Sequence, residues 1–187
     1  MTEDFKRYDN LFSLCGLNCG LCPMQIRGEC PGCFKESFCA KQCPIVPCSV
    51  RHGNLQYCFE CDEYPCAKYD GIDQYDSLIS HQNQKSDMAK AKRIGIENYL
   101  AEQKEKQQIL HRLLTEYDDG HREVFFCLAV NLMETDDLYA ALESADRETV
   151  NMTVTEKSDL IKQKLNTSAE KKGITLRLRR NTPAPLR

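Results

Sequence analysis

Two pairs of cysteines in the first third of the chain are the residues best suited to chemistry. They form the motifs C-P-G-C at 30–33 and C-F-E-C at 58–61, with 24 residues between them. A C-x-x-C turn lets two sulfurs face one ion, and a structural zinc site takes four such ligands. The Pro-Gly step of the first pair favours a tight turn, as in a metal knuckle. We therefore predict that the two pairs together bind a metal ion.

The other clustered cysteines supply more ligands than one ion can take. The chain holds twelve cysteines, eleven of them within residues 15–66. Eight would complete two tetrahedral sites, and eleven with His52, four residues after Cys48, would complete three. Two sites are favoured, because a lone histidine in a polar loop is more often solvated. The predicted ligands are Cys15, Cys19, Cys22, Cys30, Cys33, Cys43, Cys48, Cys58, Cys61 and Cys66, with Cys39 and His52 as less certain candidates.

The triplet of Cys15, Cys19 and Cys22 also fits iron chemistry. Its C-x3-C-x2-C spacing is that of radical S-adenosylmethionine enzymes, in which three thiolates hold a four-iron cluster. Those enzymes need a barrel of strand–helix repeats around the cluster, and no such repeats follow Cys22. A simple iron–sulfur electron carrier stays open, since Cys-Pro steps also suit clusters. Zinc is therefore the predicted cofactor, and a 4Fe-4S cluster is the alternative.

The cellular compartment bears on the choice between metal and disulfides. No apolar run reaches the ~20 residues of a membrane span, and the N-terminus, MTEDFKRYDN, lacks the apolar stretch of a secretory signal. These features predict a cytoplasmic protein with no membrane partner. Because the cytosol keeps thiols reduced, the same spacing favours metal over a disulfide framework. Cys127, within the apolar run 124–133, is expected to be a core thiol.

The charges are distributed unevenly along the chain. The net charge of −3 is made up of −2 in residues 1–70, −7 in residues 71–170 and +6 in residues 171–187. The cysteine-rich part has no basic stripe of the kind that nucleic-acid-binding faces carry, which argues against a nucleic-acid partner. The basic end of the chain is expected to be a solvated terminal segment.

No pattern in the chain points to catalysis. The four histidines, His52, His81, His111 and His121, are scattered, and there is no G-x-S-x-G, P-loop or G-x-G-x-x-G motif. Closed four-thiolate sites leave no position for water, so zinc here would be structural. The sequence favours an interaction module for an unidentified protein partner over an enzyme. Metal sensing or buffering stays open, because two four-cysteine sites would leave three clustered cysteines over.

The predicted secondary structure divides the chain into a loop-rich part, which holds the clustered cysteines, and a helical part. Residues 15–66 alternate Gly, Pro and Cys, which predicts loops and turns that need a metal to hold them, because large apolar residues are few. From residue 71 onward, i, i+3, i+4 patterns predict helices, including an amphipathic helix after Gly95 and a buried helix within 121–133. A cap at Thr135 predicts the start of a third helix. A T-x-x-E capping box at 153–156 predicts the start of the last helix, and Gly173 predicts its end.

The end of the chain carries the pattern of a strand. Apolar and polar residues alternate over 174–179, and again over 150–154 before the last helix, which predicts a short β-α-β unit. The expected fold class is a small metal-stabilised, loop-rich N-terminal module followed by a mainly α-helical body with a short C-terminal strand, α+β but helix-dominated. The expected domains are residues 13–70, residues 71–180 and a basic disordered tail at 181–187.

The cysteine pattern resembles that of an uncharacterised family of small cysteine-rich prokaryotic proteins, a domain of unknown function presumed to bind zinc. The family pattern is C-G-L-x-C-x-x-C, C-x-x-C, C-x4-C, C-x-x-C and aromatic-P-C. Its elements lie here at 15–22, 30–33, 43–48, 58–61 and 64–66. The pattern requires neither Cys39 nor His52, which leaves ten matched cysteines. The resemblance covers residues 13–70 and implies zinc binding and a fold, but no reaction.

Overall fold

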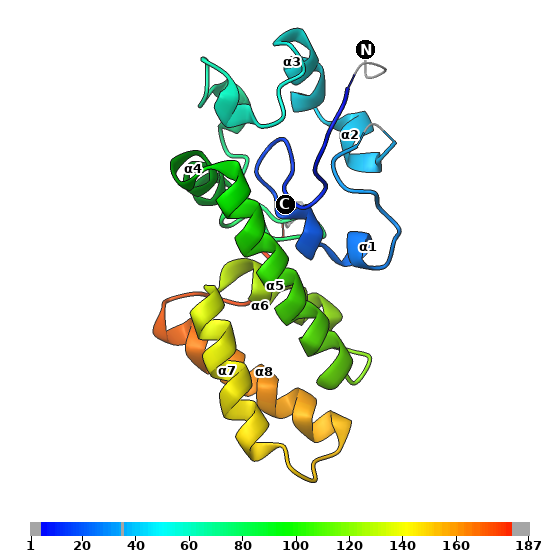
Figure 1. Cartoon of the computed structure of the whole chain (residues 1–187), viewed down its shortest axis with the longest axis vertical. Helices are drawn as coiled ribbons and strands as arrows, with labels where there is room; N and C mark the ends of the chain where they lie inside the picture. Colours follow the sequence, from blue (N-terminus) through cyan, green and yellow to red (C-terminus); the bar gives the residue numbers. More distant parts are fainter. Residues whose placement is uncertain (1–4, 35, 181–187) are drawn as a thin grey trace, which may run out of the picture.

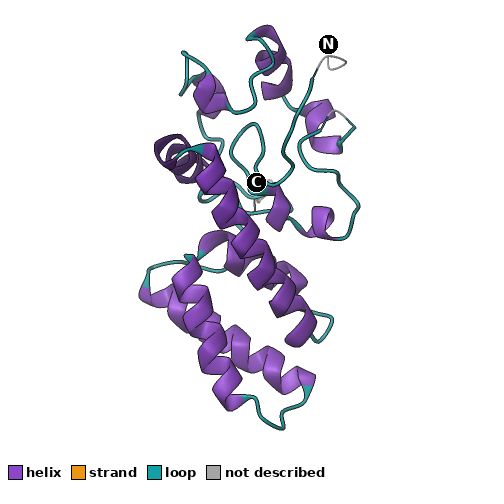
Figure 2. Cartoon of the chain, in the orientation of Figure 1, coloured by secondary structure: helices purple, strands orange, loops and turns teal. Residues whose placement is uncertain are grey.

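The computed structural model describes residues 5–34 and 36–180, which form helices joined by loops (Figure 2). The short helices and 3-10 turns of the first part are η1 (Cys19–Leu21), α1 (Pro23–Ile26), α2 (Phe38–Gln42), α3 (Ile45–Arg51), η2 (Cys58–Glu60) and η3 (Ala67–Tyr69). The longer helices are α4 (Gln84–Ile94), α5 (Ile96–Glu116), α6 (Glu123–Leu132), α7 (Thr135–Glu148) and α8 (Val154–Lys171). None of the described helices is long and apolar enough to span a bilayer.

Helix α5 connects the two ends of the molecule (Figure 1). The cysteine-rich loops with α1, α2 and α3 lie at one end, and α7 and α8 lie together at the other. Helix α5 starts beside α4 near the cysteine-rich end and runs toward α7, packing on α6 along the way. The cysteine-rich part is thus built against the same helix that supports the helical body.

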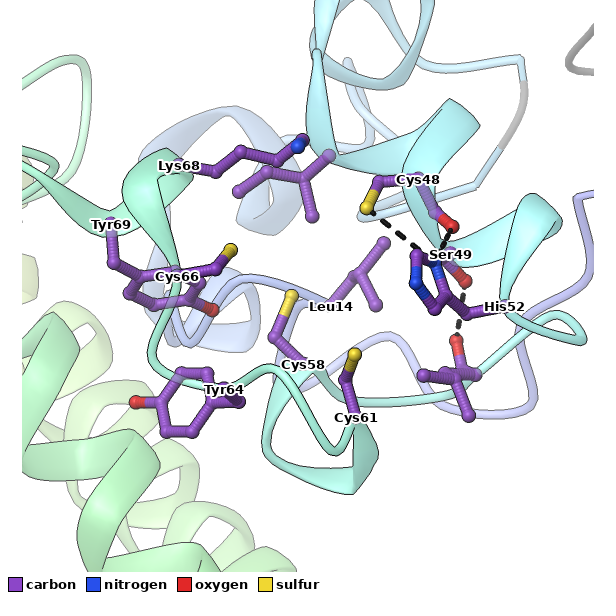
Figure 3. Close-up of a pocket in the computed structure, with 12 residues that line it drawn as sticks. Leu14, Cys48, Ser49, His52, Cys58, Cys61, Tyr64, Cys66, Lys68 and Tyr69 are labelled. Carbon is purple, nitrogen blue, oxygen red and sulfur yellow. Dashed lines mark hydrogen bonds between the residues drawn. The ribbon is translucent and has the colours of Figure 1, made fainter.

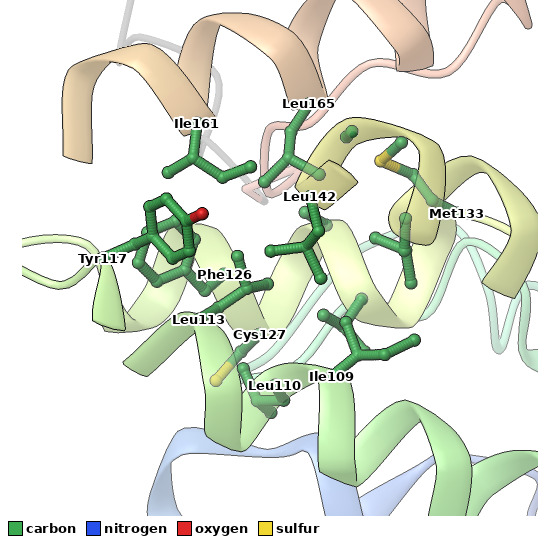
Figure 4. Packing of buried hydrophobic residues seen from close by; sticks show 14 of the residues in the cluster. Ile109, Leu110, Leu113, Tyr117, Phe126, Cys127, Met133, Leu142, Ile161 and Leu165 are labelled. Carbon is green, nitrogen blue, oxygen red and sulfur yellow. The ribbon is translucent and has the colours of Figure 1, made fainter. Parts of the chain in front are cut away.

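The larger hydrophobic core lies in the helical body, where α6 is buried on nearly every side (Figure 4). Leu110 and Leu113 of α5 and Ile161 and Leu165 of α8 are all almost completely buried in it. Cys127 of α6 is 4% exposed, which confirms the prediction of a core thiol. This core rests on apolar packing, since Cys127 is its one cysteine among the described residues.

A second core lies beneath the cysteine-rich loops. Phe12 and Leu14 from the loops pack with Met88 of α4 and Tyr99 of α5, and each of these side chains is at most 1% exposed. The ring centroids of Phe12 and Tyr99 are 4.6 Å apart. The cysteine-rich part therefore gains from α4 and α5 apolar area that residues 15–66 lack, and its core extends past residue 70.

Several helix boundaries follow the sequence patterns. The amphipathic helix after Gly95 and the buried helix within 121–133 are confirmed as α5 and α6. At the start of α8, Thr153 and Glu156 form the predicted capping box, and Gly173 adopts a φ of 70° just after the helix. Two details differ: Glu134, not Thr135, is the N-cap of α7, and residues 15–66 contain three short α-helices among their turns.

The predicted C-terminal strand is wrong, because the described part of the chain contains no β-strand. The solvent exposure of the side chains does alternate over 174–179, since Ile174, Leu176 and Leu178 are half-buried and the residues between them are exposed. It arises because the segment lies against the helical core, with Ile174 and Leu176 packed on it. The expected partner at 150–154 is instead the turn before α8, where Val150 is 73% exposed. The predicted β-α-β unit is therefore absent from the described residues, and the predicted tail at 181–187 lies outside them.

Asp76 ties the C-terminal segment to the loop that precedes α4. Its carboxylate is fully buried and accepts hydrogen bonds from the Arg179 backbone N–H at 2.7 Å and from the Arg179 guanidinium at 3.1 Å. The Asp76 N–H donates to the Arg179 carbonyl at 2.8 Å. Burial opposes the charge, but these bonds and one from the His81 N–H hold the pKa of Asp76 below its ordinary value. Asp76 thus helps to hold residues 174–180 in place without a β-ladder, together with the packing of Ile174 and Leu176 on the core.

Candidate metal centre

Four cysteines from three separate elements line one small cavity (Figure 3). Cys48 belongs to α3, Cys58 begins η2 with Cys61 directly after it, and Cys66 is the N-cap of η3. We call these four the pocket cysteines. Figure 3 shows their side chains around one space, with His52 between Cys48 and Cys61. The cavity measures about 30 Å³.

Backbone hydrogen bonds hold the pocket cysteines in position. The Cys58 N–H donates to the Leu14 carbonyl at 3.0 Å, which ties η2 to the loop before Cys15. The Cys61 N–H closes the C-x-x-C turn by donating to the Cys58 carbonyl at 3.1 Å. The Glu60 carboxylate accepts from the Tyr57 N–H and caps this turn. The second C-x-x-C pair is therefore a tight, capped turn, as a metal knuckle requires.

Apolar and aromatic side chains form the walls of the pocket. Leu14, Ile45 and Tyr69 are each at most 5% exposed, and Tyr64 packs edge-on against Tyr69 with ring centroids 4.9 Å apart. Tyr64, two residues before Cys66, therefore has a packing role in the wall of the pocket. The Tyr69 hydroxyl donates to the Cys15 carbonyl at 3.2 Å, so the wall is also linked to the first cysteine motif.

The pocket thiols lie close enough to affect each other's ionisation. The pKa of Cys58 is raised to about 12, mainly by burial; a hydrogen bond from Tyr69 lowers it, and the thiols of Cys43, Cys66 and Cys48 contribute to the increase. Without a cation the Cys58 thiol is therefore protonated at neutral pH. A bound cation would reverse this preference, because it stabilises thiolate charge.

His52 is close to the pocket but is held by its own helix. Its Nδ1 lies 3.7 Å from the Cys48 sulfur and 2.8 Å from the Cys48 carbonyl oxygen, and its Nε2 is 3.9 Å from the Glu63 carboxylate. The backbone N–H of His52 caps α3. His52 therefore caps the C-terminus of α3, and the pocket contains four cysteine sulfurs besides it.

We call the other seven clustered cysteines the second cysteine group; several of their thiols raise one another's pKa, and the Cys58 thiol of the pocket also raises the pKa of Cys15. Its members are Cys15, Cys19, Cys22, Cys30, Cys33, Cys39 and Cys43.

Ionisation in the second group is coupled in the same way. Burial raises the pKa of Cys15 to about 12, with the Cys33 thiol as the next contribution. Cys39 is exposed, yet burial of its thiol and the neighbouring thiols of Cys30 and Cys22 raise its pKa. Cys39 therefore lies among the predicted ligands, although the family pattern does not require it.

The two C-x-x-C pairs lie in different surroundings. Cys58 and Cys61 line the pocket, whereas Cys30 lines a separate hollow that includes Asn10 and Gln107. The thiols that raise the pKa of Cys33 are those of the second group. All twelve cysteines are free thiols. Within residues 5–34 and 36–180, no three His, Cys, Asp or Glu side chains already stand in an arrangement that could hold a metal ion.

A buried polar network attaches the first cysteine motif to the helices. The Asn18 amide donates to Asp87 of α4 and to Asn131 of α6, both at 2.9 Å, and its oxygen accepts from the Tyr99 hydroxyl of α5 at 2.9 Å. Asn18 is 2% exposed and Tyr99 1%. One side chain between Cys15 and Cys19 is thus bonded to three helices.

Close packing at Gly16 supports the same attachment. Gly16 has a φ of 94°, and a Cβ there would lie 2.9 Å from the Gln84 carbonyl and 3.0 Å from the Met88 side chain. The Gln84 amide donates to the Cys15 carbonyl at 2.9 Å. The Gly of C-G-L-N-C is needed both for its backbone conformation and because α4 lies against it.

Sequence reasoning missed the residues of this network. The one available signal was Asn131, a single amide in the otherwise apolar run 124–133, because a buried amide requires a partner. Asn18 gave no comparable signal, since an asparagine in a turn is common without any partner.

The buried carboxyl of Asp87 makes stability depend on pH. Burial raises the pKa of Asp87 to about 6, although Lys106 and Tyr99 of α5, Asn18 and Lys90 all lower it. Because the folded pKa exceeds the unfolded one, the stability linked to this group is complete below about pH 4 and is lost as pH rises through about 6. We expect the difference in unfolding free energy between wild type and Asp87→Asn to fall by about 1 kcal/mol from pH 5 to pH 7. Urea unfolding of both chains at each pH measures it.

The Asp87→Asn comparison cancels the pH dependence of the cysteines, which both chains share. A difference that stays constant between pH 5 and pH 7 would show that Asp87 titrates normally. As a control, Asp62→Asn changes an exposed carboxylate and should leave the pH profile as it is.

Compared with family models, with curated proteins and with solved structures, the chain matches none of them.

Proposed function

We propose that the cysteine-rich part of the chain binds zinc at two structural sites and that the protein serves as an interaction module for a protein partner. The observation that carries the proposal is the convergence of four cysteines from α3, η2 and the loop before η3 on one cavity. The family resemblance of residues 13–70 supports the same chemistry.

The donor set of the pocket favours zinc, and the size of the cavity suits a single ion. Four sulfurs without a coordinating water are the ligands of closed structural zinc sites. A cavity of about 30 Å³ has room for a single ion or one to two waters.

Zinc binding at the pocket requires the four sulfurs to come closer together, because no three ligand side chains among the described residues stand in an arrangement that could hold an ion. The pocket cysteines are half-buried and stand on short elements, and their side chains have alternative χ1 rotamers. The second ion is proposed to take its ligands from the second cysteine group, which holds seven. The metal would then stabilise the loops in addition to the second core, because binding free energy at such sites is folding free energy.

Elemental analysis with a visible spectrum, on protein purified without oxygen, tests the proposal. We expect two zinc ions per chain and no visible absorbance, because zinc–thiolate centres have no absorption there. Iron with a broad band near ~400 nm would contradict the zinc assignment and make Cys15, Cys19 and Cys22 the first residues to mutate. Protein that is metal-free and remains folded in a strong chelator would contradict structural metal of either kind.

A further inference from the structure

An open groove lies between α6 and the C-terminal segment, away from the cysteines. It measures about 890 Å³, and none of the cysteines lines it. One wall is formed by Val124, Phe125 and Leu128 of α6, and the other by residues 175–180. The proposed zinc sites have no residue in this groove, so its use is independent of them.

The floor of the groove is apolar and continues beyond it. A smaller hollow shares Val124, Leu128 and Leu178 with the groove and adds Leu78. Val124 is 46% exposed and Leu78 55%, although both are large apolar side chains. A contiguous exposed apolar surface of this kind, bordered by polar residues, is typical of a protein-binding site.

The charged side chains that line the groove are all arginines. Arg177, Arg179, Arg180 and His121 line it, and no Asp or Glu does among the described residues. Arg179 is paired with Asp76, whereas the Arg177 side chain forms no ion pair or hydrogen bond within the part of the chain that the structure describes. This concentration of arginines stands out in a chain with a net charge of −3.

We propose that the groove binds a short acidic peptide segment of a partner protein, with apolar side chains on the floor and carboxylates against the rim. The apolar floor and the basic rim together favour this occupant. A nucleic acid would satisfy the arginines but leave Val124, Leu78 and Leu178 uncovered, and a neutral apolar peptide would leave Arg177 without a partner.

Fluorescence anisotropy with a labelled short peptide in which Glu and Leu alternate tests the inference on the full, metal-loaded chain. We expect this probe to bind at least tenfold more tightly than a Lys–Leu probe and than a Glu–Ser probe, which lacks the apolar side chains. Arg177→Glu should weaken binding of the Glu–Leu probe at least tenfold, since it places like charge on the rim. Val124→Glu should also weaken binding of the Glu–Leu probe at least tenfold, because it places a negative charge on the apolar floor.

The matched control is Arg93→Glu, which makes the same charge change at an exposed position near the end of α4. Arg177→Glu removes no contact formed by that side chain among the described residues, so circular dichroism should match wild type. Equal weakening by Arg93→Glu, or equal binding of the Lys–Leu probe, would overturn the inference. So would tighter binding of an oligothymidine that Arg177→Glu abolishes, because that result assigns the groove to nucleic acid.

Discussion

A chain carrying both Cys33→Ser and Cys58→Ser should lose both zinc ions, whereas each single variant should lose one. The structure places Cys58 among the pocket cysteines and Cys33 in the second cysteine group. A serine oxygen is a poor substitute for a thiolate, and a site reduced to three thiolates releases its ion to a competing chelator. Elemental analysis after gel filtration with a weak chelator measures the stoichiometry.

The double variant distinguishes the two possible partitions. If the two C-x-x-C pairs shared one ion, as spacing alone predicts, the double variant would keep one zinc, like each single variant. That outcome would contradict the grouping proposed here. Cys127→Ala is the control, because Cys127 lies in the core of the helical body and its removal should leave the metal content unchanged.

Hydrogen exchange on the same variants should show how far the damage extends. We expect the amides of η2 and α4 to lose protection with Cys58→Ser, because Met88 and Ala91 pack in the core beneath the cysteine loops. The second half of α5, around Leu110 and Leu113, should keep its protection, since it packs in the other core.

Replacing Asn18 with Ala should destabilise the protein by about 3 kcal/mol. The substitution removes three hydrogen bonds to the buried groups of Asp87, Tyr99 and Asn131, each loss costing about 1 kcal/mol. Urea unfolding of the zinc-loaded protein, followed by circular dichroism, measures the change.

Asn98→Ala provides the matched control for Asn18→Ala. Asn98 is an exposed asparagine of α5 whose amide donates to the Ile94 carbonyl at 2.8 Å, so its loss should cost less than about 0.5 kcal/mol. If Asn18→Ala were as mild as the control, the attachment of the cysteine motif to the helices would rest on apolar packing around Phe12 and Tyr99 and on the hydrogen bond from Gln84 to Cys15.

The helices of the body could be predicted because their signals are local. The i, i+3, i+4 pattern of α5, the apolar run of α6 and the capping box at Thr153 each lie within one element. The same reasoning failed at residues 174–179, where alternating apolar and polar residues suggested a strand. A single segment lying against helices produces the same alternation as a paired strand, and only the absence of a partner separates the two.

The sequence by itself determined the helical body and which residues could act as metal ligands, because residue type and short spacing carry that information. Only the tertiary structure decided that Cys48 and Cys66 join Cys58 and Cys61, and that Asn18 bonds to three helices. Those groupings join residues up to 113 positions apart, and they depend on how loops and helices pack. Spacing along the chain does not encode such contacts, since many partitions of eleven cysteines have equally plausible loop lengths.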